Sequence, residues 1–437
     1  MKHAVVVSRL FAPEPAAAAF RLEALVRALA SGGIDVTVLT SRARPGSPPA
    51  DDDALSRPPA DGPRLPADGG TGHLRADDAP GAPPGDTPRG PARPGRVRVR
   101  RARVLRDSSG YVRGYLPYLS FDVPAALRLL TVRRPDVVVV EPPPTTGVVV
   151  RLVCALRRVP YVYYAADVWS DAARSTGSPR VVSALLARLE GWALRGARGV
   201  VAVSEGVAAR VRELARREVD VEVVRNGIDT EVFRPADDDP PVPGAPGTYF
   251  LYAGTASEWQ GAEVFALALE SVREQHPEAE LVYLGSGSAW DGLRDLAERA
   301  GAVHLLPPVR AAEAARWLRH AAGALVSIVP GLGYDFALPT KIFAASASGV
   351  PVVFAGPTAT AAELIAEGGL GRAVGHDRDA VAEAMRAVLE DPETTDPVRR
   401  AARAARLATW THEHASLARV GQRVAGLVAR WAREGTR

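Results

Sequence analysis

The chain has almost no lysine. Of its 54 basic residues only two, Lys2 and Lys341, are lysines, and all the others are arginines. A protein that otherwise uses arginine has a reason to keep lysine where a compact, flexible point charge is needed, and binding one phosphate oxygen at the start of a helix is such a place. The alternative is a surface lysine kept by chance, and the residues around Lys341 have to decide between the two.

Cysteine and long apolar runs are also scarce. Cys154 is the only cysteine, so an intrachain disulfide is excluded and a reducing compartment fits. It lies in the apolar stretch 148–156, where we expect a packed helix. No stretch reaches the roughly 18 uninterrupted apolar residues of a membrane helix, and the apolar run at the N-terminus is too short for a signal peptide. We expect a cytoplasmic protein, free or attached peripherally to the inner face of the cell membrane.

The charge balance and the histidines exclude two further classes. A net charge of +4 is too weak to predict nucleic-acid binding. The eight histidines show no metal-ligand spacing, and His412 with His414 fits a solvated helix face better than a zinc site. The sequence predicts no metal site.

What the sequence does contain is an alternation of strands and helices. At 437 residues the chain is too long for one core, so two domains are expected. A buried strand at 5–8, an amphipathic helix at about 18–31 and a strand at 35–40 predict a right-handed βαβ unit with a parallel sheet. A second series begins at 249–254. We predict an N-terminal domain at 1–220, a C-terminal domain at 221–397 and a helical tail at 398–437.

Two segments interrupt or flank this pattern. Residues 43–95 are dense in proline, glycine, aspartate and arginine with almost no large apolar residue, which predicts a disordered insertion. Seven arginines follow between Arg93 and Arg106. They fit either a solvated strand edge or contact with anionic lipid headgroups.

Glycines follow several predicted strands in the second half. They lie at 254, at 285 and 287, and at 331 and 333, where glycine lets a backbone approach a ligand closely. No dinucleotide or Walker glycine motif is complete, because Trp290 stands where a third glycine would be. Each glycine alone fits a plain turn, and together they indicate a nucleotide site. Residues 338–343 should enter a helix whose free N–H groups, with the Lys341 charge, suit a diphosphate.

One carboxylate stands out in the first half. Asp167 follows a predicted buried strand, at the edge where open α/β sheets bind ligands. Two roles remain possible for Asp167: a carboxylate that takes part in function, or the N-cap of a helix.

Together these residues resemble the family-4 retaining glycosyltransferases, over nearly the whole chain except 43–95. The similar segments are 11–14 with Arg21, 141–143, 167–171, 203–205, 225–233, 252–261 and 338–352. Of these, 141–143 and 167–171 are similar to a subgroup that builds bacterial surface polysaccharides. The two donor-half segments, 252–261 and 338–352, are the most specific.

The resemblance implies an α/β GT-B fold, in which two Rossmann-like domains face a central cleft and a C-terminal helix returns to the first domain. It implies a metal-independent, retaining hexosyltransferase that uses a UDP-, GDP- or dTDP-sugar co-substrate and no other cofactor. The acceptor would be a lipid-linked sugar or a small molecule. Asp167 and Lys341 would be catalytic, and Glu14, Arg21 and Trp169 would bind the acceptor. The implied donor-binding residues are Gly254, Thr255, Gln260, Gly261, Gly285, Val309, Asp335, Leu338, Pro339, Thr340 and Glu363.

The sequence departs from the family pattern at two positions. A glutamate that holds the ribose is usual three residues after the lysine, where this chain has Ala344. Its usual partner glutamate would fall at Phe336. Asp335 or Glu363 could replace the missing contact. These departures keep two alternatives open: a non-catalytic, nucleotide-sugar-binding or scaffold partner in a glycosylation complex, and a sugar-nucleotide epimerase.

Overall fold

The computed structural model describes residues 1–14, 16–43, 52–56, 93–107, 112, 115–171, 179–236 and 239–434. Most of the predicted insertion at 43–95 lies outside these residues. Its described part departs from the prediction, because residues Asp53–Ser56 form the short 3-10 helix η1 with Leu55 buried. By contacts, the chain divides into one unit of 1–163, 196–198 and 424–437 and a second of 164–195 and 199–423. The predicted domain boundaries stay predictions.

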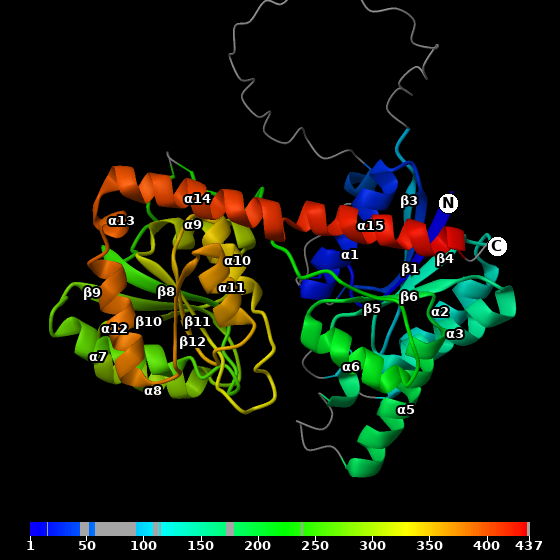
Figure 1. Cartoon of the computed structure of the whole chain (residues 1–437), viewed down its shortest axis with the longest axis horizontal. Coiled ribbons are helices and arrows are strands. Elements are labelled where there is room, and N and C mark those ends of the chain that lie inside the picture. The colour runs from blue at the N-terminus through cyan, green and yellow to red at the C-terminus, as the bar shows by residue number, and fades with distance from the viewer. Residues whose placement is uncertain are drawn as a thin grey trace, which may run out of the picture. The chain divides into compact units, whose positions relative to one another are not determined.

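The first half of the chain forms a parallel sheet of seven strands (Figure 1). Their order is β3 (Val97–Ala102), β2 (Asp35–Ser41), β1 (His3–Val7), β4 (Val137–Val140), β5 (Tyr161–Ala165), β6 (Gly199–Ala202) and β7 (Val221–Val223). The helices are α1 (Ala17–Ser31), α2 (Tyr115–Thr131), α3 (Pro144–Arg157), α5 (Arg180–Gly196) and α6 (Glu205–Ala215). The βαβ start predicted from the sequence is confirmed, since β1 and β2 pair in parallel on either side of α1 in the chain.

The second half forms a parallel sheet of six strands. Their order is β10 (Val303–Leu306), β9 (Ala279–Ser286), β8 (Thr248–Thr255), β11 (Gly323–Ser327), β12 (Val352–Ala355) and β13 (Gly371–Val374). The helices are α7 (Glu263–Arg273), α8 (Trp290–Ala300), α9 (Ala311–His320), α10 (Thr340–Ala347), α11 (Ala361–Gly368), α12 (Arg378–Leu389), α13 (Pro392–Thr395), α14 (Pro397–Ala415) and α15 (Leu417–Glu434). None of the helices in the described part of the chain is long and apolar enough to cross a bilayer.

Both sheets have the strand order of a Rossmann-like domain, in which the first and fourth strands are neighbours. In the second sheet these are β8 and β11. Successive connections leave such a pair in opposite directions, and ligands bind outside the carboxyl ends of the strands at this point. The fold therefore directs attention to the ends of β8 and β11.

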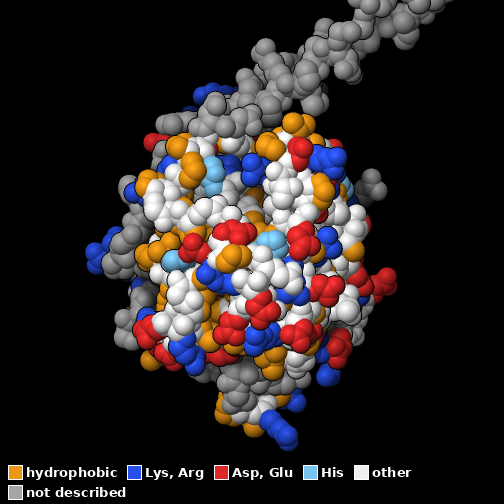
Figure 2. Space-filling model, turned by 90° about the vertical axis from the view of Figure 1, so that its left-hand side faces the viewer, with side chains coloured by type: hydrophobic (Ala, Val, Ile, Leu, Met, Phe, Trp, Pro, Cys, Tyr) orange, Lys and Arg blue, Asp and Glu red, His pale blue; other side chains and the backbone are white. Residues whose placement is uncertain are grey.

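Buried strands of the second sheet are apolar on both faces, because helices cover both. Tyr249 and Leu251 of β8 pack with α9, α10, α11 and α14, whereas Phe250 and Tyr252 pack with α7, α8 and α12. Figure 1 shows these two helix layers on either side of the strands. The near-continuous apolar strands of the sequence follow from this burial. The outer surface is different: Figure 2 shows acidic and basic side chains interspersed over one face.

Two smaller predictions from the sequence are also confirmed. Cys154 is buried in α3, where burial raises the pKa of its thiol to about 12. The strand edge that the arginines between 93 and 106 could form is present as β3, an edge strand in which Arg98 and Arg100 are exposed.

Candidate functional site

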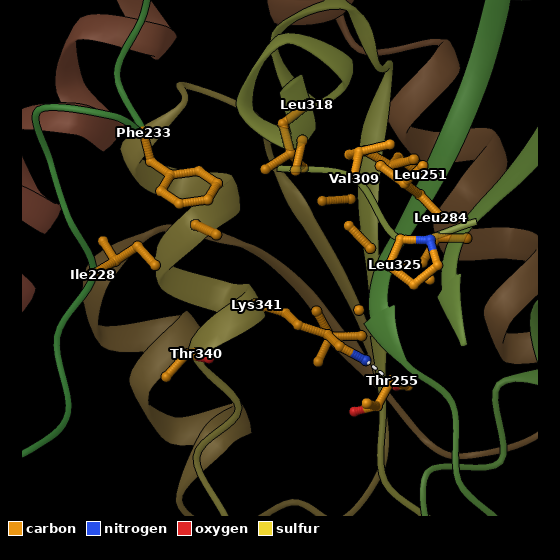
Figure 3. A pocket seen from close by; sticks show the side chains of 18 of the residues that line it. Ile228, Phe233, Leu251, Thr255, Leu284, Val309, Leu318, Leu325, Thr340 and Lys341 are labelled. Carbon is orange, nitrogen blue, oxygen red and sulfur yellow. Dashed lines mark hydrogen bonds between the residues drawn. The ribbon is translucent and has the colours of Figure 1, made fainter. Parts of the chain in front are cut away.

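Lys341 lies in the first turn of α10 and points toward the end of β8 (Figure 3). Its Nζ donates a hydrogen bond of 2.7 Å to the carbonyl oxygen of Thr255 and lies 3.8 Å from the centroid of the Tyr252 ring. A carbonyl dipole and an aromatic face both attract a cation. These contacts fix the lysine charge at the carboxyl end of the sheet.

Burial works against that charge. It lowers the pKa of the Lys341 ammonium to about 7, because a charged group loses solvation in an apolar surrounding. An anion placed beside Nζ would restore the charged form. The site therefore holds a cation that gains most when a negative group binds to it.

The start of α10 offers further donors. Pro339 is the N-cap residue, and no side chain caps the helix. The first N–H groups of a helix have no partner within the helix, and the helix dipole there attracts anions. An anion held by Lys341 would therefore also meet the start of this helix.

Two glycines allow this arrangement. Gly254 and Gly285 are paired across β8 and β9, and both have positive φ, +120° and +159°. A Cβ on Gly254 would lie 2.9 Å from Lys341 Cε, and one on Gly285 would lie 2.0 Å from the Gly254 carbonyl oxygen. From the sequence we predicted that these glycines let a ligand approach the backbone closely. The structure shows that the Lys341 side chain approaches Gly254 and that the backbone of β8 approaches Gly285.

Replacing Gly254 by alanine should therefore displace Lys341. We expect affinity for UDP, GDP and dTDP to fall roughly tenfold or more, the scale of one lost charge-assisted contact. The matched control is Gly301→Ala, which also puts alanine at positive φ but meets nothing within 4 Å. Titration calorimetry of both variants tests this, and equal affinities in the two would contradict it.

A cavity of about 390 Å³ adjoins Lys341 at the ends of β8 and β9. Its polar side chains are Thr255, Ser286, Thr340 and Lys341. The remaining lining residues are Ile228, Phe233, Leu251, Ala253, Gly254, Leu284, Gly285, Pro308, Val309, Ala314, Leu318, Ala324, Leu325, Val326 and Ala344. Figure 3 shows Phe233 and Ile228 on one side and Leu318, Val309 and Leu284 on the other. Of the described residues lining it, none is a carboxylate.

The loops that follow β8 and β11 are held together beside this cavity. The Trp259 ring stacks on the Tyr334 ring with centroids 4.5 Å apart, and the Trp259 carbonyl accepts a bond from the Val329 N–H. Gln260 is buried and accepts from the Ser257 N–H, and the carbonyl of Gly261 is 3.0 Å from His376 Nε2. These two predicted donor residues thus build the loop around the cavity and do not line it.

The structure brings together about half of the predicted donor-binding residues. Those that line the cavity are Gly254, Thr255, Gly285, Val309 and Thr340, with Lys341. Asp335 accepts a bond from the Gly331 N–H, Leu338 packs on the apolar core, and Glu363 is exposed on α11. The ribose contact that Asp335 or Glu363 could supply therefore has no counterpart in the cavity lining.

Sequence reasoning missed Tyr252 and Phe233 as facing or lining residues, whereas it singled out Ala344, which lines the cavity. Tyr252 sits in an apolar strand, and nothing in the sequence tells which of its faces meets Lys341. Phe233 was noted only as part of the similar segment 225–233. Spacing from Lys341 on α10 was the one usable signal, because Ala344 lies three residues on, on the same face.

Asp167 lies in the loop after β5 and is exposed. The N-cap interpretation does not hold for it, because the Glu190 carboxylate accepts the N–H groups of Trp169 and Ser170, both at 3.1 Å. Glu190 is buried, and burial raises the pKa of its carboxyl group although the two N–H bonds oppose the shift. The Asp167 carboxylate is left free to bind another group.

The three predicted acceptor residues have structural partners. Arg21 and Glu141 form a buried ion pair of 2.6 Å, and Glu14 pairs with Arg106 at 2.8 Å. Trp169 is half-buried, and its backbone N–H donates to the Glu190 carboxylate. Their assignment to an acceptor stays a prediction.

Two family models match the chain. One, described as a glycosyl transferase 4-like domain, matches residues 17–227. The other, described as glycosyl transferases group 1, matches residues 247–391. No curated protein sequence matches the chain significantly.

Several solved structures share the fold. HepE from Anabaena, solved in complex with UDP, is 15% identical with a TM-score of 0.62 and covers 98% of this chain and 100% of its own. Sucrose-phosphate synthase from Thermosynechococcus elongatus is 14% identical, with a TM-score of 0.65 and coverage of 98% and 99%. A putative UDP-N-acetylglucosamine 2-epimerase from Listeria monocytogenes is 14% identical, with a TM-score of 0.57 and coverage of 99% and 98%. The chain therefore has the α/β GT-B fold, which transferases and epimerases share.

Proposed function

We propose that the chain transfers a sugar from a nucleotide-diphosphate donor, because a glycosyl transferase 4-like model matches residues 17–227 and a glycosyl transferases group 1 model matches residues 247–391. The transfer would retain the anomeric configuration, and the acceptor would be a lipid-linked sugar or a small molecule. The observation that carries this proposal is Lys341 Nζ, held between the Thr255 carbonyl and the Tyr252 ring beside a largely apolar cavity.

In this proposal the donor diphosphate lies against Lys341 and the start of α10. Negative charge grows on the leaving diphosphate as the bond to the sugar breaks, and a fixed cation stabilises that charge more than the ground state. The nucleoside would enter the apolar part of the cavity toward Val309 and Phe233. The binding of UDP to HepE, a structural relative, supports a donor of this class.

The acceptor would bind at the loop after β5. Asp167 is exposed there without a described partner, so its carboxylate can accept a hydrogen bond from an acceptor hydroxyl. Glu190 holds this loop through the N–H groups of residues 169 and 170. We assign Asp167 to binding the attacking hydroxyl, with the leaving phosphate as the group that takes its proton.

A mass-spectrometric screen of UDP-, GDP- and dTDP-sugars without an acceptor tests the proposal. We expect slow hydrolysis of one donor class, with release of free sugar and nucleoside diphosphate. Water in the acceptor's place makes this readout independent of the unknown acceptor. Failure of every donor both to bind, by calorimetry, and to hydrolyse would refute the proposal.

A second candidate function is a non-catalytic, nucleotide-sugar-binding partner. The specific observation in its favour is Ala344, which lines the cavity at the position where a ribose-binding glutamate is expected. The donor screen with calorimetry distinguishes the two functions, because donor binding without hydrolysis or transfer would favour the binding partner. Inversion at a sugar carbon without release of the nucleotide would instead identify an epimerase.

A further inference from the structure

The outward face of α2 is apolar along its whole length. Its exposed aliphatic side chains are Leu116, Leu119, Val123, Leu127 and Leu130, which are 70%, 50%, 55%, 59% and 39% exposed. They are spaced by three or four residues and therefore share one face of the helix. On the opposite face Phe121, Ala125 and Leu129 are buried, and the helix contacts β2 and β3. A surface helix normally carries charged or polar residues on its outer face, and α2 does not.

The neighbouring helix α3 extends this surface. The two helices pack against each other, and Figure 1 shows them side by side. Leu152 and Leu156 of α3 are 56% and 75% exposed and four residues apart. Leu105 is 57% exposed, and its N–H bonds to Ser120 of α2. We name these eight side chains the α2–α3 apolar face. Exposed apolar side chains gathered on one helix face, as on α2, are typical of an interaction site.

Exposed arginines lie at the ends of this face. Between residues 93 and 158 the sequence has 14 arginines, no lysine and four acidic residues. Arg133, Arg134 and Arg158 lie exposed at the C-terminal ends of α2 and α3, and Arg103 is exposed before Leu105. Arg157 donates to the carbonyls of Leu129 and Val132, which fixes the end of α3 to the end of α2.

Arg101 and Arg106 pair with Asp52 and Glu14, and few other acidic groups offset the charge of this region. Asp122 and Glu141 are buried, and the Asp136 carboxylate accepts bonds from the N–H groups of Lys2 and His3. Within the described residues of this region, only Asp107 remains, and it is half-buried. Figure 2 shows another face of the molecule, on which acidic and basic side chains are interspersed.

The charges decide which occupant fits. A second copy of the chain in a symmetric dimer would place the same surface against itself, so the arginines would face one another. An anionic bilayer instead offers acyl chains to the leucines and phosphate groups to the arginines at its surface. We propose that the α2–α3 apolar face docks on the surface of a membrane that contains anionic lipids. None of its residues belongs to the donor site, so this inference does not rest on the proposed function.

Flotation of the full chain with vesicles of phosphatidylcholine, with and without phosphatidylglycerol, tests this. We expect the protein to float with the anionic vesicles at least tenfold more than with the neutral ones, and less in high salt. Val123→Ser with Leu127→Ser should reduce flotation on anionic vesicles at least tenfold. Arg133→Gln with Arg134→Gln should weaken binding and flatten its salt dependence.

The chain offers a matched control. Val181 and Leu185 on α5 are also four residues apart and exposed, at 80% and 54%. Val181→Ser with Leu185→Ser should leave flotation unchanged, and circular dichroism melts should show all variants folded. The proposal is overturned if the wild type does not float, if both serine pairs act alike, or if light scattering shows a dimer that only the α2 pair dissociates.

Discussion

Replacing Lys341 by alanine should lower kcat/KM roughly 10²–10³-fold, the scale found when one preorganised group at a developing anion is removed. The lysine ammonium is the only charged side chain among the described residues that line the cavity. Without it, the leaving diphosphate would have the start of α10 and the hydroxyl groups of Thr255, Ser286 and Thr340 as its polar partners in the cavity lining. Steady-state kinetics of donor hydrolysis measures this loss for the donor that the screen identifies.

The Lys341→Ala variant should lose activity without losing stability. A lysine whose pKa is lowered by burial opposes folding, so its removal does not take away a stabilising charge. We therefore expect the melting temperature of Lys341→Ala to stay within a few degrees of wild type. Lys341→Met, which keeps the packing on Tyr252, should be at least as stable and equally inactive. Turnover near that of wild type in either variant would remove Lys341 from the site.

The donor affinity should fall about tenfold per pH unit as the pH rises above 7. The free protein holds Lys341 with a pKa of about 7, and a diphosphate beside Nζ raises that pKa because it favours the charged form. Between the two pKa values, binding takes up a proton, so rising pH weakens it. Below pH 7 the lysine is already charged and its contribution is constant.

Calorimetry of a nucleotide-sugar between pH 7 and 9, in two buffers of different ionisation enthalpy, measures this linkage directly. The diphosphate of such a donor is diesterified and does not titrate in this range, so the proton can be assigned to the protein. Lys341→Arg is the control, because a guanidinium stays charged at every pH used. A wild-type profile as flat as that of the arginine variant would contradict the assignment.

The sequence predicted the fold well because its signal is local. A strand covered on both faces is a run of apolar residues, as in Val137–Val140, and an amphipathic helix such as Ala17–Ser31 shows its period within a few turns. The glycines at 254 and 285 were recognised by their place after such strands, and the structure explains each by a backbone or side chain that approaches closely. The short helix η1 was missed because it depends on distant partners, such as the ion pair of Asp52 with Arg101.

The sequence by itself determined that Lys341 is exceptional and that it opens a helix after a strand of the second sheet. Only the tertiary structure decided what surrounds it. The Thr255 carbonyl lies 86 residues away in the chain, and it reaches Nζ because β8 and β11 are neighbours although two strands separate them in sequence. The tertiary structure also decided the role of Glu190. Its carboxylate accepts the N–H of Ser170, 20 residues away in the chain, and so fills the N-cap role that was open for Asp167. Local patterns follow from each residue's own preferences, whereas such partners follow from strand order and register, which bring distant residues together.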